Sequence, residues 1–160
     1  PAGVEADLRG VQFAVSVSAP DNERLNEQHI NALRVMSGQP PCWGARTLST
    51  DPEWKYIPVR RLALFIEASL DRGLKWAAFE PNDQPLWTKL RGTVGNFMAR
   101  LFRDGAFAGS TPDQAWFVRC DRSTITENDI VDGRLILLVG FAPLRPAEFV
   151  VLRIVITADG

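Results

Sequence analysis

The chain has 160 residues, 46% hydrophobic and 23% charged, which is enough for one hydrophobic core and bounds it to one or two domains. Its formal net charge of −1 excludes a global basic field that would recruit nucleic acid or anionic lipid. No apolar run reaches membrane-spanning length and the first residues do not form a signal peptide, so the sequence predicts no membrane insertion. The chain begins with Pro1 rather than Met, which suggests a fragment or a processed chain.

Short elements are predicted for the first third of the chain. Residues 10–18 alternate between apolar and polar, a pattern typical of a half-buried strand. A short polar helix is expected to start at a cap, Asp21 or Asn22, and to end near His29. A strand is expected within residues 30–35, and the breakers at 38–41 predict a loop. His29 has no recognisable catalytic partner, so we interpret it as a surface or capping residue.

A first amphipathic helix is predicted over about residues 58–72. Apolar residues recur there at three- and four-residue spacing, while charged residues lie off that stripe. Pro58 suits the first helical position, and Gly73 suits a C-terminal cap. Residues 75–79, directly after this helix, are predicted to form a short strand.

A second amphipathic helix is predicted over about residues 85–103, again from apolar spacing. Its opposite face carries four basic residues: Lys89, Arg91, Arg100 and Arg103. This basic face is either an ordinary solvated helix surface or a docking stripe for an acidic partner.

The last third of the chain is predicted to be mainly strand. Residues 115–120 have strand propensity, and Thr126 can cap a single helical turn through Ile130. Two long apolar runs, 134–141 and 148–156, are joined by five residues with two prolines, in a wide hairpin or a crossing to another sheet. The predicted fold class is therefore α+β, a mixed and mainly antiparallel sheet packed with the two amphipathic helices.

The final apolar run is hydrophobic on both of its faces, so both faces need to be covered. Two interpretations remain open. The run is either central in its own sheet, or it completes a sheet across a subunit boundary by strand addition.

No nucleotide-binding, metalloprotease, hydrolase or calcium-binding motif is found, so we expect neither a catalytic residue nor a cofactor. Cys42 and Cys120 lack zinc-ligand spacing and predict no metal site. We expect them to be buried thiols, with a disulfide between them left open. A rival hypothesis is a hydrolytic or ligand-binding domain that uses the region of Trp54, Glu80 and Cys120. It requires a deep pocket with perturbed pKa values.

Several segments in a fixed order carry a resemblance to a known family: residues 43–47 (WGART), 56–61 (YIPVRR), 65–69 (FIEAS), 79–82 (FEPN), 86–87 (LW), 117–121 (FVRCD) and 142–149 (APLRPAEF). Over about residues 26–156 they resemble the C-terminal part of contractile phage tail sheath proteins, as in myophage tails and related contractile injection systems.

This resemblance implies that residues 1–54 are the end of a preceding sheath domain, named subtilisin-like but without protease function, plus a linker. It implies that residues 55–160 are the tail sheath C-terminal domain. The partners would be other sheath subunits, in a helical homo-oligomer, and the inner tail tube protein. Subunits would exchange extended arms that complete a shared sheet. The protein would assemble in the bacterial cytoplasm and end in the virion tail.

Candidate contact residues follow from the pattern and the resemblance together. The inter-subunit candidates are Arg60, Arg61, Glu148, Phe149, Val151, Arg153 and Val155. We expect at least one of Arg60 and Arg61 to form an inter-subunit ion pair or to bind a nearby carboxylate such as Glu148. A local salt bridge within the subunit remains an open alternative. The basic face of Lys89, Arg91, Arg100 and Arg103 supplies the tube-contact candidates.

Overall fold

The computed structural model describes residues 2, 8–35, 42–144 and 150–157. The chain divides into two compact units, Pro1–Arg61 and Leu62–Gly160. Among the described residues, no helix has the length and apolar character needed to cross a membrane.

The first unit is small and loop-rich. Helix α1 (Ala19–Glu27) begins earlier than predicted, because Ser18 accepts the N–H of Asp21 and Pro20 occupies the first turn, where its missing N–H costs nothing. Strand β1 (Ala32–Leu33) pairs antiparallel with β2 (Cys42–Trp43), so the strand expected within 30–35 is much shorter. A 3₁₀ turn, η1 (Pro52–Trp54), follows.

The strand predicted over residues 10–18 is wrong: the structure has no strand there. Its alternating pattern needs a neighbouring strand, and the described residues provide none. The side chain of Val15 is 74% exposed, so the pattern covers no core. The loop predicted at 38–41 lies outside the described residues.

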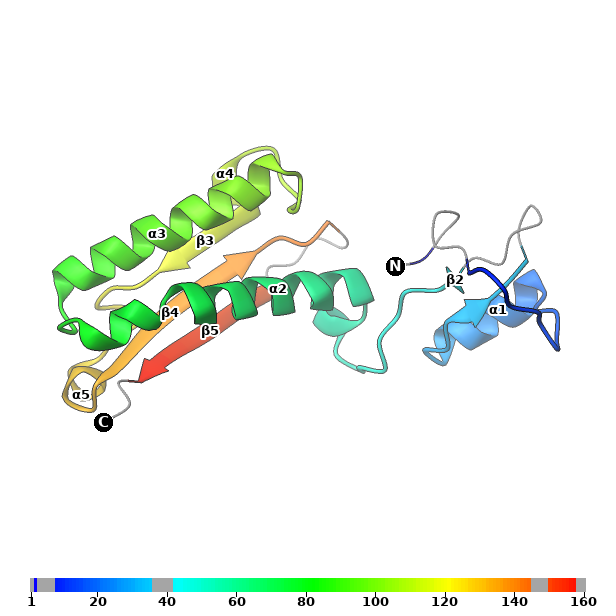
Figure 1. Cartoon of the computed structure of the whole chain (residues 1–160), viewed down its shortest axis with the longest axis horizontal. Coiled ribbons are helices and arrows are strands. Elements are labelled where there is room, and N and C mark those ends of the chain that lie inside the picture. Colours follow the sequence, from blue (N-terminus) through cyan, green and yellow to red (C-terminus); the bar gives the residue numbers. More distant parts are fainter. Residues whose placement is uncertain (1, 3–7, 36–41, 145–149, 158–160) are drawn as a thin grey trace. The chain divides into compact units, whose positions relative to one another are not determined.

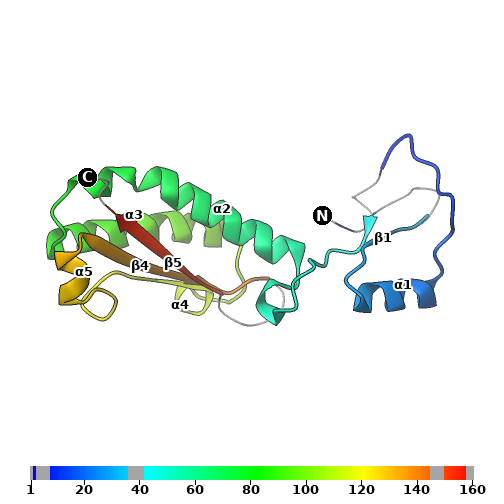
Figure 2. The ribbon, with the colours of Figure 1, turned by 90° about the horizontal axis from the view of Figure 1, so that it is seen from below.

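The two predicted amphipathic helices are confirmed to within one residue. Helix α2 (Ile57–Gly73) buries the stripe that includes Ala63, Ile66 and Leu70. Helix α3 (Gln84–Arg103) begins at Asp83, whose carboxylate accepts the N–H of Leu86. Figures 1 and 2 show α2 and α3 on the same side of the sheet in the second unit.

Between these helices the chain forms a 3₁₀ helix, η2 (Lys75–Phe79), where a strand was predicted. That prediction is wrong because the segment finds its hydrogen bonds locally. The N–H of Ala77 bonds to the carbonyl of Leu74, and the N–H of Glu80 bonds to the carbonyl of Ala77. The five residues of η2 therefore need no neighbouring strand.

The described sheet of the second unit has three antiparallel strands in the order β3 (Trp116–Arg119), β4 (Arg134–Phe141) and β5 (Val150–Thr157). Strands β4 and β5 pair along their whole lengths, from Arg134↔Thr157 to Phe141↔Val150. This is the wide hairpin of the two predicted alternatives. Two short helices flank β3, α4 (Pro112–Ala115) and α5 (Glu127–Val131), and the predicted Thr126 cap of α5 is confirmed as a full capping box.

Alternation along β4 defines the two faces of the sheet. Leu135 and Leu137 pair with Ile156 and Ile154, which lie against α2, so the odd-numbered side chains of β4 face the helices. These side chains are at most 4% exposed and form the core with the buried stripes of α2 and α3. The even-numbered residues of β4 face the other way.

One position on that other face demands glycine. A Cβ at Gly140 would lie 2.2 Å from Cε1 and 2.5 Å from Cζ of Phe117, on the neighbouring strand. We therefore expect Gly140→Ala to lower the free energy of unfolding by about 1–3 kcal/mol, because the Phe117 ring must move off β4.

Urea denaturation measures this difference. Gly92→Ala is the matched control, since nothing lies within 4 Å of its Cβ position in α3, and it should stabilise the protein by about 0.5–1 kcal/mol. Equal effects of the two substitutions would contradict the steric explanation.

Candidate assembly interface at the edge of the sheet

Strand β5 lies at the edge of the described sheet. Its neighbour on one side is β4, and none of the described residues pairs with its other side. The interpretation that the final apolar run is central in its own sheet is therefore wrong for the described part of the chain. An eight-residue strand at an edge presents a row of unpaired N–H and C=O groups, which is a template for another strand.

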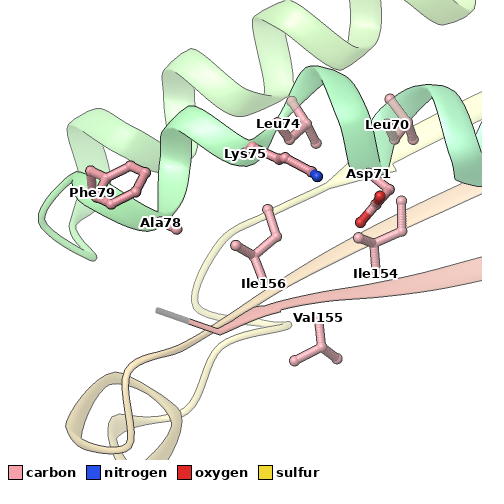
Figure 3. A pocket seen from close by; sticks show the side chains of 9 residues that line it. All are labelled: Leu70, Asp71, Leu74, Lys75, Ala78, Phe79, Ile154, Val155 and Ile156. Atoms are coloured by element: carbon pink, nitrogen blue, oxygen red, sulfur yellow. The ribbon is translucent and has the colours of Figure 1, made fainter. Parts of the chain in front are cut away.

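A groove of about 470 Å³ lies beside this strand (Figure 3). One wall comes from the end of α2 and from η2, and the other comes from β5. The lining residues are Leu70, Asp71, Leu74, Lys75, Ala78, Phe79, Ile154, Val155 and Ile156. In Figure 3, Ile154 and Ile156 point toward the helix, whereas Val155 points to the opposite side of the strand.

Two features of the groove suit a protein ligand. The side chain of Phe79 is 90% exposed, although burial of a phenylalanine side chain is favourable in free energy. Asp71 and Lys75 add one charge of each sign, and neither has an ion pair within the described ranges. The groove therefore combines apolar walls with polar groups able to orient an extended segment.

The predicted inter-subunit residues fall in different places. Arg153 is exposed on β5, and Val155 is 41% exposed. Val151 lies in β5 opposite Gly140. Arg60 stacks over the ring of Trp54, with 4.9 Å between its Cζ and the ring centroid, while Arg61 is exposed without an ion pair among described residues. Glu148 and Phe149 lie outside the described residues.

The four predicted tube-contact residues do not form one stripe. At 100° per residue, Arg91 lies about 200° around the helix from Lys89. Arg100 and Arg103 lie within about 40° of Lys89. Arg91 is half-buried, and its guanidinium donates to the carbonyl of Cys120 and to the hydroxyl of Thr88.

The remaining three basic residues of α3 also differ. Lys89 pairs with Glu80 at 3.5 Å and lies 4.2 Å from the ring centroid of Trp76. Arg100 and Arg103 are exposed in the last turn, and no hydrogen bond or ion pair to their side chains occurs among the described residues. These two are therefore the arginines of this helix best placed to reach a partner.

The residues of the rival hydrolytic hypothesis have other roles. Cys120 is fully buried, and burial raises the pKa of its thiol to about 11, so the thiol is protonated at neutral pH. Glu80 is exposed and bonds to Lys89. Neither lines the groove beside β5, and Trp54 belongs to the first unit. Both cysteines are free thiols, and the described residues contain no group of three metal-ligating side chains.

Asn31 contacts the backbone of the segment from Trp43 to Thr47 at Gly44 and Arg46. The Asn31 amide donates to the carbonyl of Arg46 at 2.7 Å and accepts its N–H at 2.8 Å. A Cβ at Gly44 would lie 2.8 Å from the Cα of Asn31, so only glycine allows this approach. Nδ1 of His29 lies 2.8 Å from the carbonyl of Thr47, and this contact gives His29 a structural role.

An open sheet edge beside an apolar groove is typical of domains that assemble with other chains. The family model of the phage tail sheath C-terminal domain matches residues 49–157, and the chain belongs to this family. The resemblance inferred from the sequence is thereby confirmed.

Three solved structures are similar over 96% of this chain. The anti-feeding prophage baseplate contains a chain with 38% identity and a TM-score of 0.83, of which 43% is covered. The sheath complex of the extracellular contractile injection system PVC, in its contracted state, gives 36% identity, a TM-score of 0.82 and 44% coverage. The contracted helical sheath of the anti-feeding prophage gives 38% identity, a TM-score of 0.80 and 44% coverage of its chain. This chain thus spans less than half the length of these relatives, and no curated protein matches it.

The two arginines Arg91 and Arg100 should differ in their effect on stability. We expect Arg91→Ala to lower the free energy of unfolding by about 1–3 kcal/mol, because it removes a charged donor from the carbonyl of Cys120. Arg100→Ala, at an exposed position, should change it by less than about 0.5 kcal/mol. Urea denaturation of both variants measures this, and a stability loss at Arg100 equal to that at Arg91 would refute the distinction.

Proposed function

We propose that this chain is the C-terminal part of a contractile sheath subunit, which polymerises helically around an inner tube and contracts to drive the tube through a bacterial envelope. The observation that carries this proposal is the family match, joined by 36–38% identity to contracted sheath assemblies over 96% of the chain. Residues 1–54 would end the preceding sheath domain, and residues 55–160 would form the C-terminal domain. The subunit would assemble in the bacterial cytoplasm and act without a cofactor or a catalytic residue.

Neighbouring subunits would be joined by strand addition at β5. The open edge supplies backbone donors and acceptors, and each added hydrogen bond contributes about 0.5–1.5 kcal/mol. The groove beside β5 would receive apolar side chains of the incoming segment, with Phe79 covering them. Such a joint can hold neighbours together while each subunit rotates between two packings, whose free-energy difference supplies the work.

Contact with the inner tube would use the end of helix α3. Arg100 and Arg103 are exposed and have no ion pair among the described residues, so they can pair with carboxylates of the tube. Lys89 would assist from the same side of the helix after leaving Glu80, an exchange that costs little at an exposed site. Arg91 stays engaged with Cys120 and supports the helix that carries the others.

The edge contact is tested by polymerisation of the complete sheath protein, observed by electron microscopy and sedimentation. The wild type should form tubular polymers. Val155→Lys should reduce polymer yield at least tenfold, because a charge on an edge strand opposes strand addition. Val131→Lys makes the same change at an 85% exposed valine on α5 and should polymerise normally. Absence of wild-type polymers would reject the proposed function.

The tube contact is tested by reversing charge at the end of α3. We expect the double variant Arg100→Glu and Arg103→Glu to co-sediment with tube protein at least tenfold more weakly than the wild type, since attraction becomes repulsion. Arg72→Glu, an exposed arginine near the end of α2, serves as the control. Unchanged co-sedimentation of the double variant would show that another surface meets the tube.

A further inference from the structure

The face of the sheet turned away from α2 and α3 carries two arginines, Arg119 and Arg153, which the strand register brings into one row. Arg119 of β3 pairs with Leu138 of β4, and Leu138 pairs with Arg153 of β5. Paired residues project on the same side of a sheet. The two arginines therefore flank Leu138 on one face, with their Cα atoms about 10 Å apart, twice the spacing of neighbouring strands.

This row lacks a strong acidic partner within the described residues. The three strands contain no aspartate or glutamate. Arg119 is exposed and lies over the ring of Phe117 at 5.1 Å, and Arg153 is exposed on β5. Neither forms an ion pair with a described residue, whereas Arg134, on the same face, pairs with Asp129 at 3.1 Å and with Asp132 at 2.8 Å.

The charge of Arg119 interacts with that of the Asp121 carboxylate. Hydrogen bonds from Ser123 lower the pKa of the Asp121 carboxyl, and the charges of Arg91 and Arg119 lower it further. The carboxylate of Asp121 is already bonded to the backbone N–H and hydroxyl of Ser123, at 2.8 Å and 2.6 Å. It therefore offsets part of the charge of Arg119 without occupying the guanidinium donors.

Apolar side chains surround these arginines. Leu138 is half-buried, as is Phe117, and Val155 is 41% exposed. We call the four residues Phe117, Arg119, Leu138 and Arg153 the basic sheet face. An apolar centre with exposed arginines and an aromatic ring has the composition of a protein interface core.

We propose that the basic sheet face binds an acidic segment of a second sheath subunit. Arginine binds carboxylates through two parallel hydrogen bonds, and an acidic segment would supply the charge that these strands lack. Arg153 lies on β5, so a strand added to the open edge of β5 would lie next to Arg153. The inference rests on the proposed sheath function, and it identifies the chemistry of the neighbouring subunit at a surface distinct from the edge.

Arg119→Glu tests this contact, since β3 lies at the opposite edge of the described sheet from β5, and the substitution leaves strand addition at β5 intact. We expect the variant of the complete sheath protein to yield at least fivefold less polymer than the wild type, while its far-UV circular dichroism spectrum stays that of the folded protein. Arg72→Glu is the matched control and should polymerise normally. If Arg119→Glu does not fold, Arg119→Gln removes the charge without reversing it, and it should also lower polymer yield.

A second measurement identifies the partner directly. Arg119→Lys keeps the positive charge and gives a carbodiimide reagent an amine that it can couple to a carboxylate in contact. In assembled polymers, we expect Lys at this position to cross-link to an aspartate or glutamate of another sheath subunit. Coupling only within its own subunit, or to the tube protein, would overturn the proposal, as would normal polymerisation of Arg119→Glu in a sample whose wild type polymerises. Failure of the wild type itself to polymerise would instead reject the sheath function.

Discussion

The pairing of β4 with both of its neighbours is the constraint on which the rest of the second unit depends. Strand β4 pairs with β5 over eight residues and with β3 over four. Its helix-facing side chains are at most 4% exposed. Because β4 occupies one side of β5, the other side of β5 is the open one. Successive side chains of β5 point to opposite faces of the sheet, so the groove lies on the helix-facing side and the basic sheet face lies on the other side.

The parts of this fold that the sequence predicts well are those with local causes. Helices α2 and α3 follow from apolar spacing with Pro58 and Asp83 near their starts, and α5 follows from the Thr126 cap. Strands need a partner that no local pattern contains. Residues 10–18 have strand alternation without a neighbour among the described residues, and Lys75–Phe79 satisfies its backbone within a 3₁₀ turn.

The candidate site is less visible in the sequence, because it depends on register and on helical angle. The apolar final run directs attention to Arg153 and Val155, yet Arg119 joins them only once β3, β4 and β5 are aligned at Leu138. The predicted strand over residues 75–79 does not indicate that Phe79 is exposed, and its exposure is seen only with the 3₁₀ helix η2. Arg91 belongs to a basic helix by composition, but the rotation of that helix directs it to the carbonyl of Cys120.

In a contractile sheath, an edge joint and a charged face would have different tasks. Backbone hydrogen bonds at β5 are numerous, directional and independent of side-chain identity, so together they resist separation while a subunit turns. An exposed arginine–carboxylate pair contributes only about 0–1 kcal/mol and is screened by salt, so it can be exchanged at little cost. The open edge therefore suits the more persistent contact, and the basic sheet face suits the contact that is exchanged more easily.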